Sequence, residues 1–424
     1  MSSTNRAAVP RVRARPRPRK APKPVVVEAA APDSRQAVLL ATDGTGNLIV
    51  SVHVKRTFQL LPTGECRIAD EQAPFLSGEP SEPRANGEAG AVAAAGVVGT
   101  GDDNVFPELD IIPHKMATDL IVMASAYARA GKPTKRMIAG IDCGKLQRRM
   151  LVQGNRRSYF RSDGQIGFTD ADPFEVMPLR YEYAYGGCDP TTPVPPIANL
   201  LDAMLPHPGI YPRNPAGRGY AVTGNREHVE GLALPNIENP RDALTPARLV
   251  SGAAENWWRQ PLPWCCDWFD ASWYPRSVHL GGLPEYLPED DSQMEEVRLG
   301  YVDGGQRARF AVAGMADLFD ARFSDAATPG MVLPFLYGDE TIRLLGMTPS
   351  GELEVRLPAR RPRIAVRASG KTAEVQPVAN RILISTDEMG VYVVWHGAWA
   401  CGKRMKDLGG VEVFVDSRKV EAAA

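Results

Sequence analysis

The chain has 424 residues and a formal net charge of −1, so the whole molecule exerts no sustained electrostatic attraction on nucleic acid. Because 44 % of the residues are hydrophobic, a sizeable core can be buried, and the 39 glycines and 37 prolines indicate many turns and short strands. No apolar window of about eighteen residues occurs, which argues against a membrane span.

Residues 1–34 predict a disordered basic tail. Arginine and lysine alternate here with alanine, valine and proline, and no acidic residue precedes Glu28. Dense proline blocks helix and like charges repel, which favours an extended chain. The alternative interpretation is an arm over residues 6–23 that binds nucleic acid or an acidic surface. No apolar stretch follows the basic residues, so a secretory signal is not expected.

The six cysteines are scattered and show no metal-ligand spacing. We expect free thiols in a reducing cytosol, with no disulfide framework and no bound metal. The positions are Cys66, Cys143, Cys188, Cys265, Cys266 and Cys401.

Residues 36–69 predict three strands. The runs on either side of Asp43-Gly44 are rich in β-branched residues and form a predicted hairpin. In its second strand Val50, Val52 and Val54 would line one face, and Ser51, His53 and Lys55 the other. A further strand is predicted from Glu65 to Ala69, and the glycine-rich segment 77–104 predicts a long surface loop.

Two segments that follow also predict strands. Residues 117–130 are rich in alanine, which favours helix, but the flanking turns favour a strand. Residues 135–152 predict two strands with a turn at Asp142-Cys143-Gly144. The run from Gly140 to Lys145 has one residue too few for a phosphate loop, and Leu146 stands where magnesium binding needs Ser or Thr.

The stretch 178–240 is the densest in aromatic residues, arginine, glycine and proline. Its prolines predict short strands joined by rigid turns. Tyr181, Tyr183 and Tyr185 alternate as on one strand face. Arg180 and Glu182 would then lie on the opposite face, where we expect a cross-strand ion pair that fixes register.

Three motifs in this stretch resemble domain-of-unknown-function family 2169, found in bacterial type VI secretion loci. They are Arg-Tyr-Glu followed by aromatic-Gly-Gly, then Asn-Pro-x-Gly-x-Gly-aromatic, then Leu-Pro-Asn-x-Glu-x-Pro. Their residues are Arg180, Tyr181, Glu182, Tyr185, Gly186, Gly187, Asn214, Pro215, Gly217, Gly219, Tyr220, Leu234, Pro235, Asn236, Glu238 and Pro240. The resemblance extends over roughly residues 37–398 and includes Lys115, Thr118, Asp119, Arg156 and Asp387.

This resemblance implies a non-enzymatic adaptor in the bacterial cytoplasm. Similar proteins are thought to act as chaperones that bind a toxin effector and help to load it onto the spike-tip proteins (VgrG/PAAR-type) of the secretion apparatus. The motif residues would then be structural or partner-binding, and no catalytic residue or cofactor is implied.

Five tryptophans lie between residues 257 and 273. One interpretation is that they pack the layers of the fold together. The other is a partner-binding surface, because tryptophan is enriched at interface hot spots. The residues are Trp257, Trp258, Trp264, Trp268 and Trp273.

The remaining chain predicts a series of antiparallel strands. Residues 285–296 predict a surface connection and Asp303-Gly304-Gly305 predicts a hairpin turn; strand-like runs follow about every ten residues. The fold class is mainly β, with antiparallel strands in sandwich or barrel-like sheets, long Pro/Gly-rich loops and few short helices. The predicted order is tail 1–34, β-rich domain 35–296, C-terminal β region 297–416 (alternatively one unit with the preceding part) and frayed end 417–424.

No enzyme template fits the sequence. It contains neither G-x-S-x-G nor H-E-x-x-H, and no two of its six histidines have metal-ligand spacing. Two alternatives to the adaptor stay open. One is a hydrolase or carbohydrate-active enzyme that uses the aromatic region 257–273, and the other is a structural component of a contractile injection particle.

Overall fold

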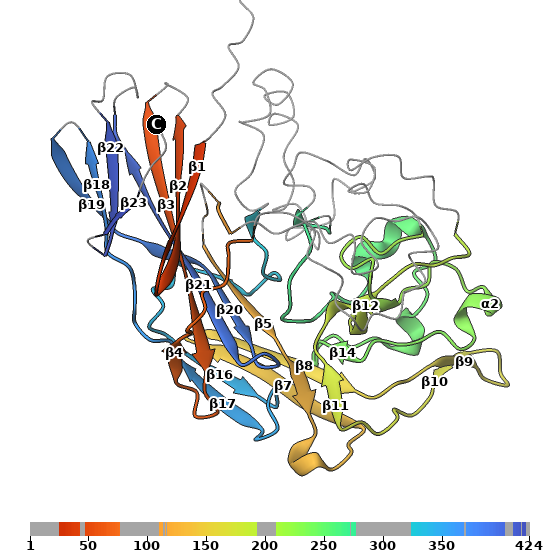
Figure 1. The fold of residues 1–424 in the computed structure, drawn as a ribbon. Helices are drawn as coiled ribbons and strands as arrows, with labels where there is room; N and C mark the ends of the chain where they lie inside the picture. The colour runs from red at the N-terminus through yellow and green to blue at the C-terminus, as the bar shows by residue number, and fades with distance from the viewer. Residues whose placement is uncertain are drawn as a thin grey trace, which may run out of the picture.

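The chain folds into several, mostly antiparallel β-sheets, which confirms the predicted mainly β class (Figure 1). The computed structural model describes residues 25–42, 47–76, 110–112, 115, 117–192, 209–271, 273–276, 324–368, 370–402, 410–416 and 418–420. The predicted loop 77–104, the connection 285–296, the hairpin at residues 303–305 and residues 1–24 lie outside these ranges.

The largest sheet combines early and late parts of the chain in eight strands. Its order is β1–β2–β3–β21–β20–β5–β15, with β4 also paired to β3. The strands are β1 (Val25–Ala31), β2 (Ser34–Thr42), β3 (Leu48–Leu60), β4 (Cys66–Ile68), β5 (Thr118–Met123), β15 (Val332–Leu333), β20 (Val378–Ser385) and β21 (Gly390–Ala400). All neighbours are antiparallel except β20 and β5, which run parallel.

The hairpin predicted around residue 43 is confirmed by the pairing of β2 with β3, and the next predicted strand is β4. Residues 117–130 form β5 and β6 (Ser125–Tyr127), as the strand prediction required. Val50, Val52 and Val54 are buried in one apolar cluster on a single face of β3. Because strand residues alternate between faces, Ser51, His53 and Lys55 lie on the other face.

A five-stranded sheet packs against the largest sheet. Its order is β14–β8–β7–β16–β17, and the β7–β8 hairpin confirms the two strands predicted over residues 135–152. The strands are β7 (Arg136–Cys143), β8 (Leu146–Gln153), β14 (Ile237–Glu238), β16 (Thr341–Leu345) and β17 (Glu352–Arg356). Leu120 and Trp395 from the large sheet share a buried cluster with Ile141 and Leu344 from this one. Each such side chain contributes about 1.5–3 kcal/mol by burial.

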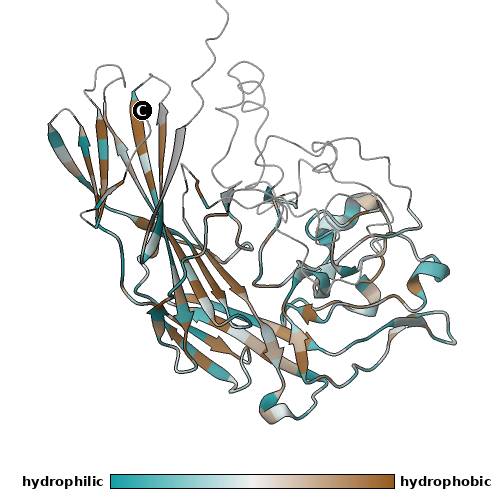
Figure 2. Cartoon of the chain, viewed as in Figure 1, coloured by the Kyte–Doolittle hydropathy of each residue, from teal (hydrophilic) through white to brown (hydrophobic). Residues whose placement is uncertain are grey.

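A four-stranded sheet covers the other end of the same apolar face. Its order is β19–β18–β22–β23. The strands are β18 (Ile364–Ala368), β19 (Lys371–Val375), β22 (Val411–Val415) and β23 (Arg418–Val420). Val366 and Val413 pack there against Val50 and Val52 of β3. Figure 2 shows the hydrophobic residues that run along these strands.

The rest of the described chain consists of short pieces. These are β6, β9 (Ser158–Phe160), β10 (Ile166–Phe168), β11 (Val176–Pro178), β12 (Tyr185–Gly186), β13 (Arg218–Gly219), α2 (Arg226–Val229) and the 3-10 turns η2 (Arg129–Gly131), η3 (Tyr181–Tyr183), η4 (Pro246–Arg248) and η5 (Ala254–Arg259). None of the helices in the described residues is long and apolar enough to cross a membrane.

Three predictions about local structure are wrong. The predicted frayed end begins at residue 417, but residues 418–420 form β23, because they pair with β22. The predicted tail reaches residue 34, but residues 25–31 form β1, because the valine-rich run pairs with β2. The predicted strand through Tyr181, Tyr183 and Tyr185 is instead the 3-10 turn η3 followed by β12, so the tyrosines do not share a strand face.

Candidate functional site

The first two family motifs meet in one tight assembly. The two-residue strands β12 and β13 run parallel, which pairs Tyr185 with Arg218 and Gly186 with Gly219. The Asn214 side-chain amide donates to the carbonyl oxygens of Tyr181 (2.8 Å) and Tyr185 (3.1 Å). Gly186 has φ +151°, and a Cβ there would lie 2.1 Å from the Asn214 carbonyl oxygen. Only glycine fits this approach.

The third motif joins the same assembly. The Asn236 amide donates to the Gln153 carbonyl oxygen (3.0 Å), while its own oxygen accepts from the Arg218 guanidinium (3.1 Å). Arg218 also donates to the Glu182 carbonyl oxygen (2.8 Å). Three segments that are distant in sequence are therefore fixed to one another by polar side chains whose partners are mainly backbone groups.

Glu238 is the buried anion of this assembly. Its carboxylate accepts from Arg156 (2.5 Å), Gln153 (2.6 Å) and the Leu244 backbone N–H (2.7 Å). Burial raises the pKa of Glu238, and the Arg156 charge opposes that rise. Removing one partner of such a buried pair costs about 3–5 kcal/mol, because the other charge is left uncompensated.

The motif charges Arg180 and Glu182 do not pair with each other across strands. Arg180 instead lies 3.6 Å from Asp267 and 3.8 Å from Asp387, and Glu182 is exposed. The expected register-fixing pair is therefore wrong, because the 3-10 turn separates the two side chains. The structure does bring together Arg180 and Asp387, two positions that carry the family resemblance.

The five tryptophans separate into two groups. Trp257 and Trp273 are buried, each with edge-to-face contacts to other aromatic rings. The other three are partly exposed, and each carries an arginine over its ring. These pairs are Trp258 with Arg259 (4.7 Å), Trp264 with Arg148 (3.9 Å) and Trp268 with Arg381 (4.7 Å). The rings therefore do not form one open aromatic platform.

A row of charges crosses the polar face of the largest sheet. Lys55, Val394, Arg381 and Asp119 are register neighbours on β3, β21, β20 and β5. The ion pairs alternate along this row: Lys55–Asp110 (2.7 Å), Asp110–Arg381 (2.9 Å), Arg381–Asp119 (3.7 Å), Asp119–Lys115 (3.0 Å) and Lys115–Asp325 (2.8 Å). Five of the six side chains are buried, and Asp325 is nearly so.

Sequence reasoning missed this row. Its bonded neighbours Asp110 and Arg381 are 271 residues apart, so no local spacing reveals the row. One available signal was Lys55, a charge inside a valine-rich strand. Burial raises the pKa of Asp325, and the adjacent Lys115 charge opposes that rise. The row fixes Asp110, Lys115 and Asp325 to the sheet.

Next to this row lies a pair of stacked histidines. The rings of His53 and His396 are 4.8 Å apart and nearly parallel, and both approach the Ser51 hydroxyl through Nε2 (3.1 and 2.8 Å). His53 is fully buried and its Nδ1 has no hydrogen-bond partner. Burial, and then the neighbouring His396, hold the pKa of His53 well below its usual value. In the part of the chain that the structure describes, no three His, Cys, Asp or Glu side chains group as metal ligands.

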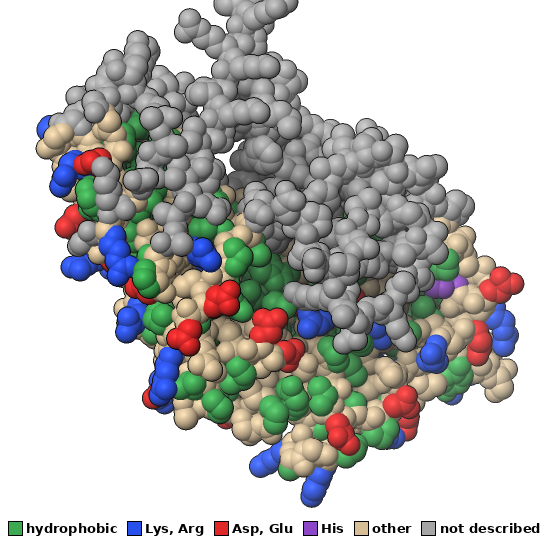
Figure 3. Space-filling model, in the orientation of Figure 1, with side chains coloured by type: hydrophobic (Ala, Val, Ile, Leu, Met, Phe, Trp, Pro, Cys, Tyr) green, Lys and Arg blue, Asp and Glu red, His purple; other side chains and the backbone are tan. Residues whose placement is uncertain are grey.

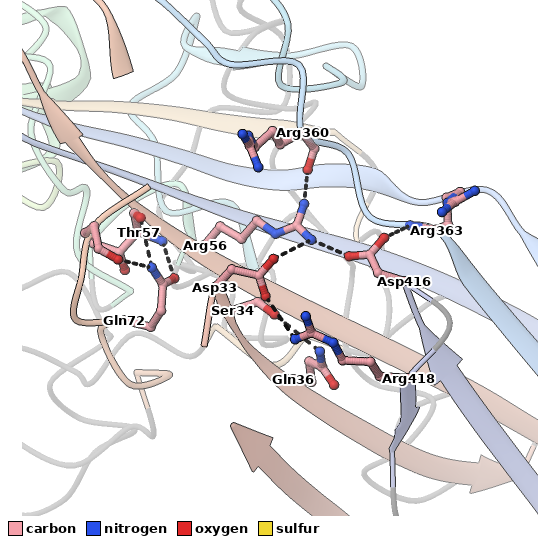
Figure 4. Close-up of polar contacts among 11 residues, drawn as sticks. Asp33, Ser34, Gln36, Arg56, Thr57, Gln72, Arg360, Arg363, Asp416 and Arg418 are labelled. Atoms are coloured by element: carbon pink, nitrogen blue, oxygen red, sulfur yellow. Dashed lines mark hydrogen bonds and ion pairs between the residues drawn. The ribbon is translucent and has the colours of Figure 1, made fainter. Parts of the chain in front are cut away.

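Arg56 fixes the junction between the largest and the four-stranded sheets (Figure 4). Its guanidinium donates to the Arg360 carbonyl oxygen and to the Asp416 carboxylate. Asp33, in the β1–β2 turn, lies 4.0 Å from Arg56 and 3.5 Å from Arg418. This buried cation therefore ties three turns together, and its role is structural.

Arg148, on β8, is a further buried cation and faces the core. Its guanidinium donates one long hydrogen bond, to the Pro329 carbonyl oxygen (3.3 Å), and stacks on Trp264. Nε and Nη2 have no hydrogen-bond partner. A cation–π contact contributes up to about 2 kcal/mol, whereas burying an ion costs several kcal/mol, so the charge of Arg148 is undercompensated.

These features define a mainly β protein whose recurring motif residues build an internal polar framework. Residues 45–396 match the family described as an uncharacterized protein conserved in bacteria, domain-of-unknown-function family 2169, and the chain belongs to that family. No curated protein and no solved structure matches the chain.

Proposed function

We propose that this protein is a non-enzymatic adaptor of a type VI secretion system. It binds a toxin effector in the cytoplasm and helps to load it onto the spike proteins. The observation that supports this proposal best is that residues of the three motifs have structural roles. Asn214, Asn236 and Glu238 are buried and hold backbone segments in place. In this chain the motif residues thus build a scaffold, which fits a binding protein.

The free edge of the largest sheet is the contact that we assign to the effector. Strand β1 pairs along its seven residues with β2 and, among the described residues, with no other strand. An open edge offers N–H and C=O groups that an extended segment of a partner can pair with. Shielding a segment in this way stabilises the partner by mass action, without chemistry.

The exposed charges agree with a protein partner. Figure 3 shows acidic and basic side chains interspersed over the described part of the visible face. A single-sign patch of the kind that attracts nucleic acid is not seen there. Several basic–acidic neighbours are exposed pairs, such as Arg343–Glu352 and Arg356–Glu354.

Co-expression with a candidate toxin effector from the same genome tests the proposal. The soluble yield of the effector and its secretion should both fall when the adaptor is omitted. If the effector is equally soluble and equally secreted without it, the adaptor function is refuted. A pull-down repeated after deletion of residues 1–24, which leaves β1 intact, separates the basic arm from the edge.

Proline substitutions test the edge itself. Successive backbone N–H groups of a strand point to opposite sides. One of the two substitutions Val26→Pro and Val27→Pro therefore removes an N–H that points away from the sheet, and the other removes an N–H that donates to β2. The variant that keeps the parent thermal stability is the informative one. This variant should bind the effector at least tenfold more weakly than the parent. Unchanged affinity would show that β1 is not part of the surface that binds the effector.

A hydrolase is the alternative with a specific observation in its favour. Ser51 and His396 have the contact of a nucleophile and its base, but both are buried, and the His396 ring stacks on a second histidine, His53. Ester or glycoside turnover by the purified chain that Ser51→Ala abolishes would favour the enzyme. Retention at fixed stoichiometry in purified injection particles would favour a structural component.

A further inference from the structure

An apolar run at one edge of the largest sheet is left partly exposed. Residues 332–337, with the sequence Val-Leu-Pro-Phe-Leu-Tyr, begin with β15, which ends the strand order of that sheet, and none of the six is fully buried. The Tyr337 side chain is 48 % exposed. Because consecutive exposed apolar residues are disfavoured on a free protein surface, such a run marks an interaction surface.

Hydrogen bonds fix the backbone of Tyr337. Its carbonyl oxygen accepts from the Trp395 indole N–H (3.2 Å), and its N–H donates to the Glu340 carboxylate (2.7 Å). The carbonyl oxygen of the next residue, Gly338, accepts from the Ala359 N–H (3.0 Å). The end of the apolar run is therefore held beside the loop that follows β17, while the Tyr337 ring remains accessible.

Three arginines of that loop carry charges without a counter-ion. Arg360, Arg361 and Arg363 are exposed, and no Asp or Glu oxygen of the described residues lies within 4.0 Å of their guanidinium groups. Other exposed arginines, such as Arg343, do have such a carboxylate partner. The Arg361 guanidinium lies over the Tyr337 ring, 5.1 Å from its centroid, which joins the arginines and the apolar run in one surface.

The arginines project from a backbone that is itself fixed (Figure 4). The Arg360 carbonyl oxygen accepts from the buried Arg56 guanidinium, and the Arg363 N–H donates to the Asp416 carboxylate (2.9 Å). The side chains of Arg360 and Arg363 extend away from these contacts. Tyrosine and arginine are enriched at interface hot spots, and a fixed backbone reduces the entropy that is lost on binding.

We propose that residues 332–337 and 360–363 form a docking surface for a protein segment that is both acidic and apolar. Carboxylates of the segment would pair with the three guanidinium groups, and an apolar side chain would pack on Tyr337. The exposed carboxylate of Asp339 and the partly exposed one of Asp416 border the surface and would repel the phosphates of a nucleic acid. This surface lies at the opposite end of the sheet order from β1, and the inference is independent of the adaptor function.

Fluorescence anisotropy of a labelled octapeptide of six glutamates and two phenylalanines, titrated with the full chain, tests the surface. The parent should bind this acidic peptide at least tenfold more tightly than a control peptide with serine in place of every glutamate. Arg361→Ser should weaken the binding about tenfold, because it removes a charge and the group that stacks on Tyr337. Arg343→Ser is the matched control, since that exposed arginine already pairs with Glu352, and it should leave the affinity unchanged.

Tyr337→Ser tests the apolar contact separately. It keeps the backbone bonds to Trp395 and Glu340 and should also weaken binding of the acidic peptide about tenfold. Equal affinity for the acidic and serine peptides, or an affinity that neither Arg361→Ser nor Tyr337→Ser changes, overturns the proposal. Tighter binding of a labelled thymidine oligonucleotide that is lost on Arg361→Ser would assign the surface to nucleic acid and overturn it as well. None of these results depends on effector yield, so the surface can fail while the adaptor function stands.

Discussion

The Asn214 side-chain nitrogen lies 2.8 Å from the Tyr181 carbonyl oxygen and joins two segments separated by 33 residues. The same nitrogen also reaches the Tyr185 carbonyl oxygen. One buried amide thus holds both ends of the first family motif against the second. Because these bonds need the close approach of Gly186, the assembly depends on backbone geometry as much as on side chains.

Gly186→Ala should therefore destabilise the protein by at least about 2 kcal/mol, because its Cβ would overlap the Asn214 carbonyl oxygen. Urea unfolding followed by tryptophan fluorescence measures the change. The matched control is Gly224→Ala, where a Cβ meets no atom within 4 Å, and it should shift stability by less than about 0.5 kcal/mol. Equal effects at the two positions would refute the packing argument.

The Arg156–Glu238 pair should behave as a buried ion pair. Glu238→Gln leaves the Arg156 guanidinium without its anion and should cost about 3–5 kcal/mol. Adding Arg156→Met to that variant should recover part of the loss. Breaking the exposed Arg343–Glu352 pair with Glu352→Gln should cost less than about 1 kcal/mol. A Glu238→Gln variant as stable as the parent would contradict this role.

Stability should decrease below pH 6.5 because of His53. The pKa of His53 is lowered in the folded state, so an unfolded chain binds a proton there that the native chain does not. The contribution of neutral His53 is complete above pH 6.5 and is lost as the pH falls towards the folded pKa. The loss is up to about 1.4 kcal/mol per pH unit. The adjacent His396 also opposes the protonation of His53.

His53→Gln should reduce the pH dependence of the unfolding free energy between pH 5 and 7 by about one proton. The raised pKa values of Asp325 and Glu238 affect parent and variant equally, so the comparison isolates His53. An identical slope for parent and His53→Gln would show that His53 titrates normally.

The partly or fully buried thiols should react slowly. Burial raises the pKa of Cys66, Cys143 and Cys188 to about 11 from an ordinary 9.0. Since the thiolate is the nucleophile, iodoacetamide should label these sites about 100-fold more slowly at pH 7 than in the denatured chain. Peptide mapping by mass spectrometry gives the rate for each cysteine. Rates equal to those of the denatured chain would contradict the burial of these residues.

Sequence reasoning succeeded where structure is determined by local pattern. The alternation of Val50, Val52 and Val54 is enough to predict β3, and glycine or aspartate punctuates most of the later strands. It failed at Tyr181–Tyr183, because tyrosines two apart suit both a strand and a tight turn. The deciding contact comes from Asn214, which no local pattern contains.

The polar features of the large sheet were beyond local reasoning for a related reason. Ser51 and His396 are separated by 345 residues, and they meet only because β21 pairs with β3. The motif residues were identified through the resemblance, but their roles became clear only from their partners. Asn236, for example, is defined by bonds to Gln153 and Arg218.

The position of β21 has a consequence for biosynthesis. This strand, Gly390–Ala400, fills the gap between β3 and β20, and it pairs with β3 over its whole length. The chain must therefore be synthesised through residue 400 before the central sheet can close. Until then one edge of β3 in the nascent chain has no partner strand, so we expect general chaperones to bind the chain there. An early stop codon that removes β21 would leave this edge unpaired and would favour aggregation.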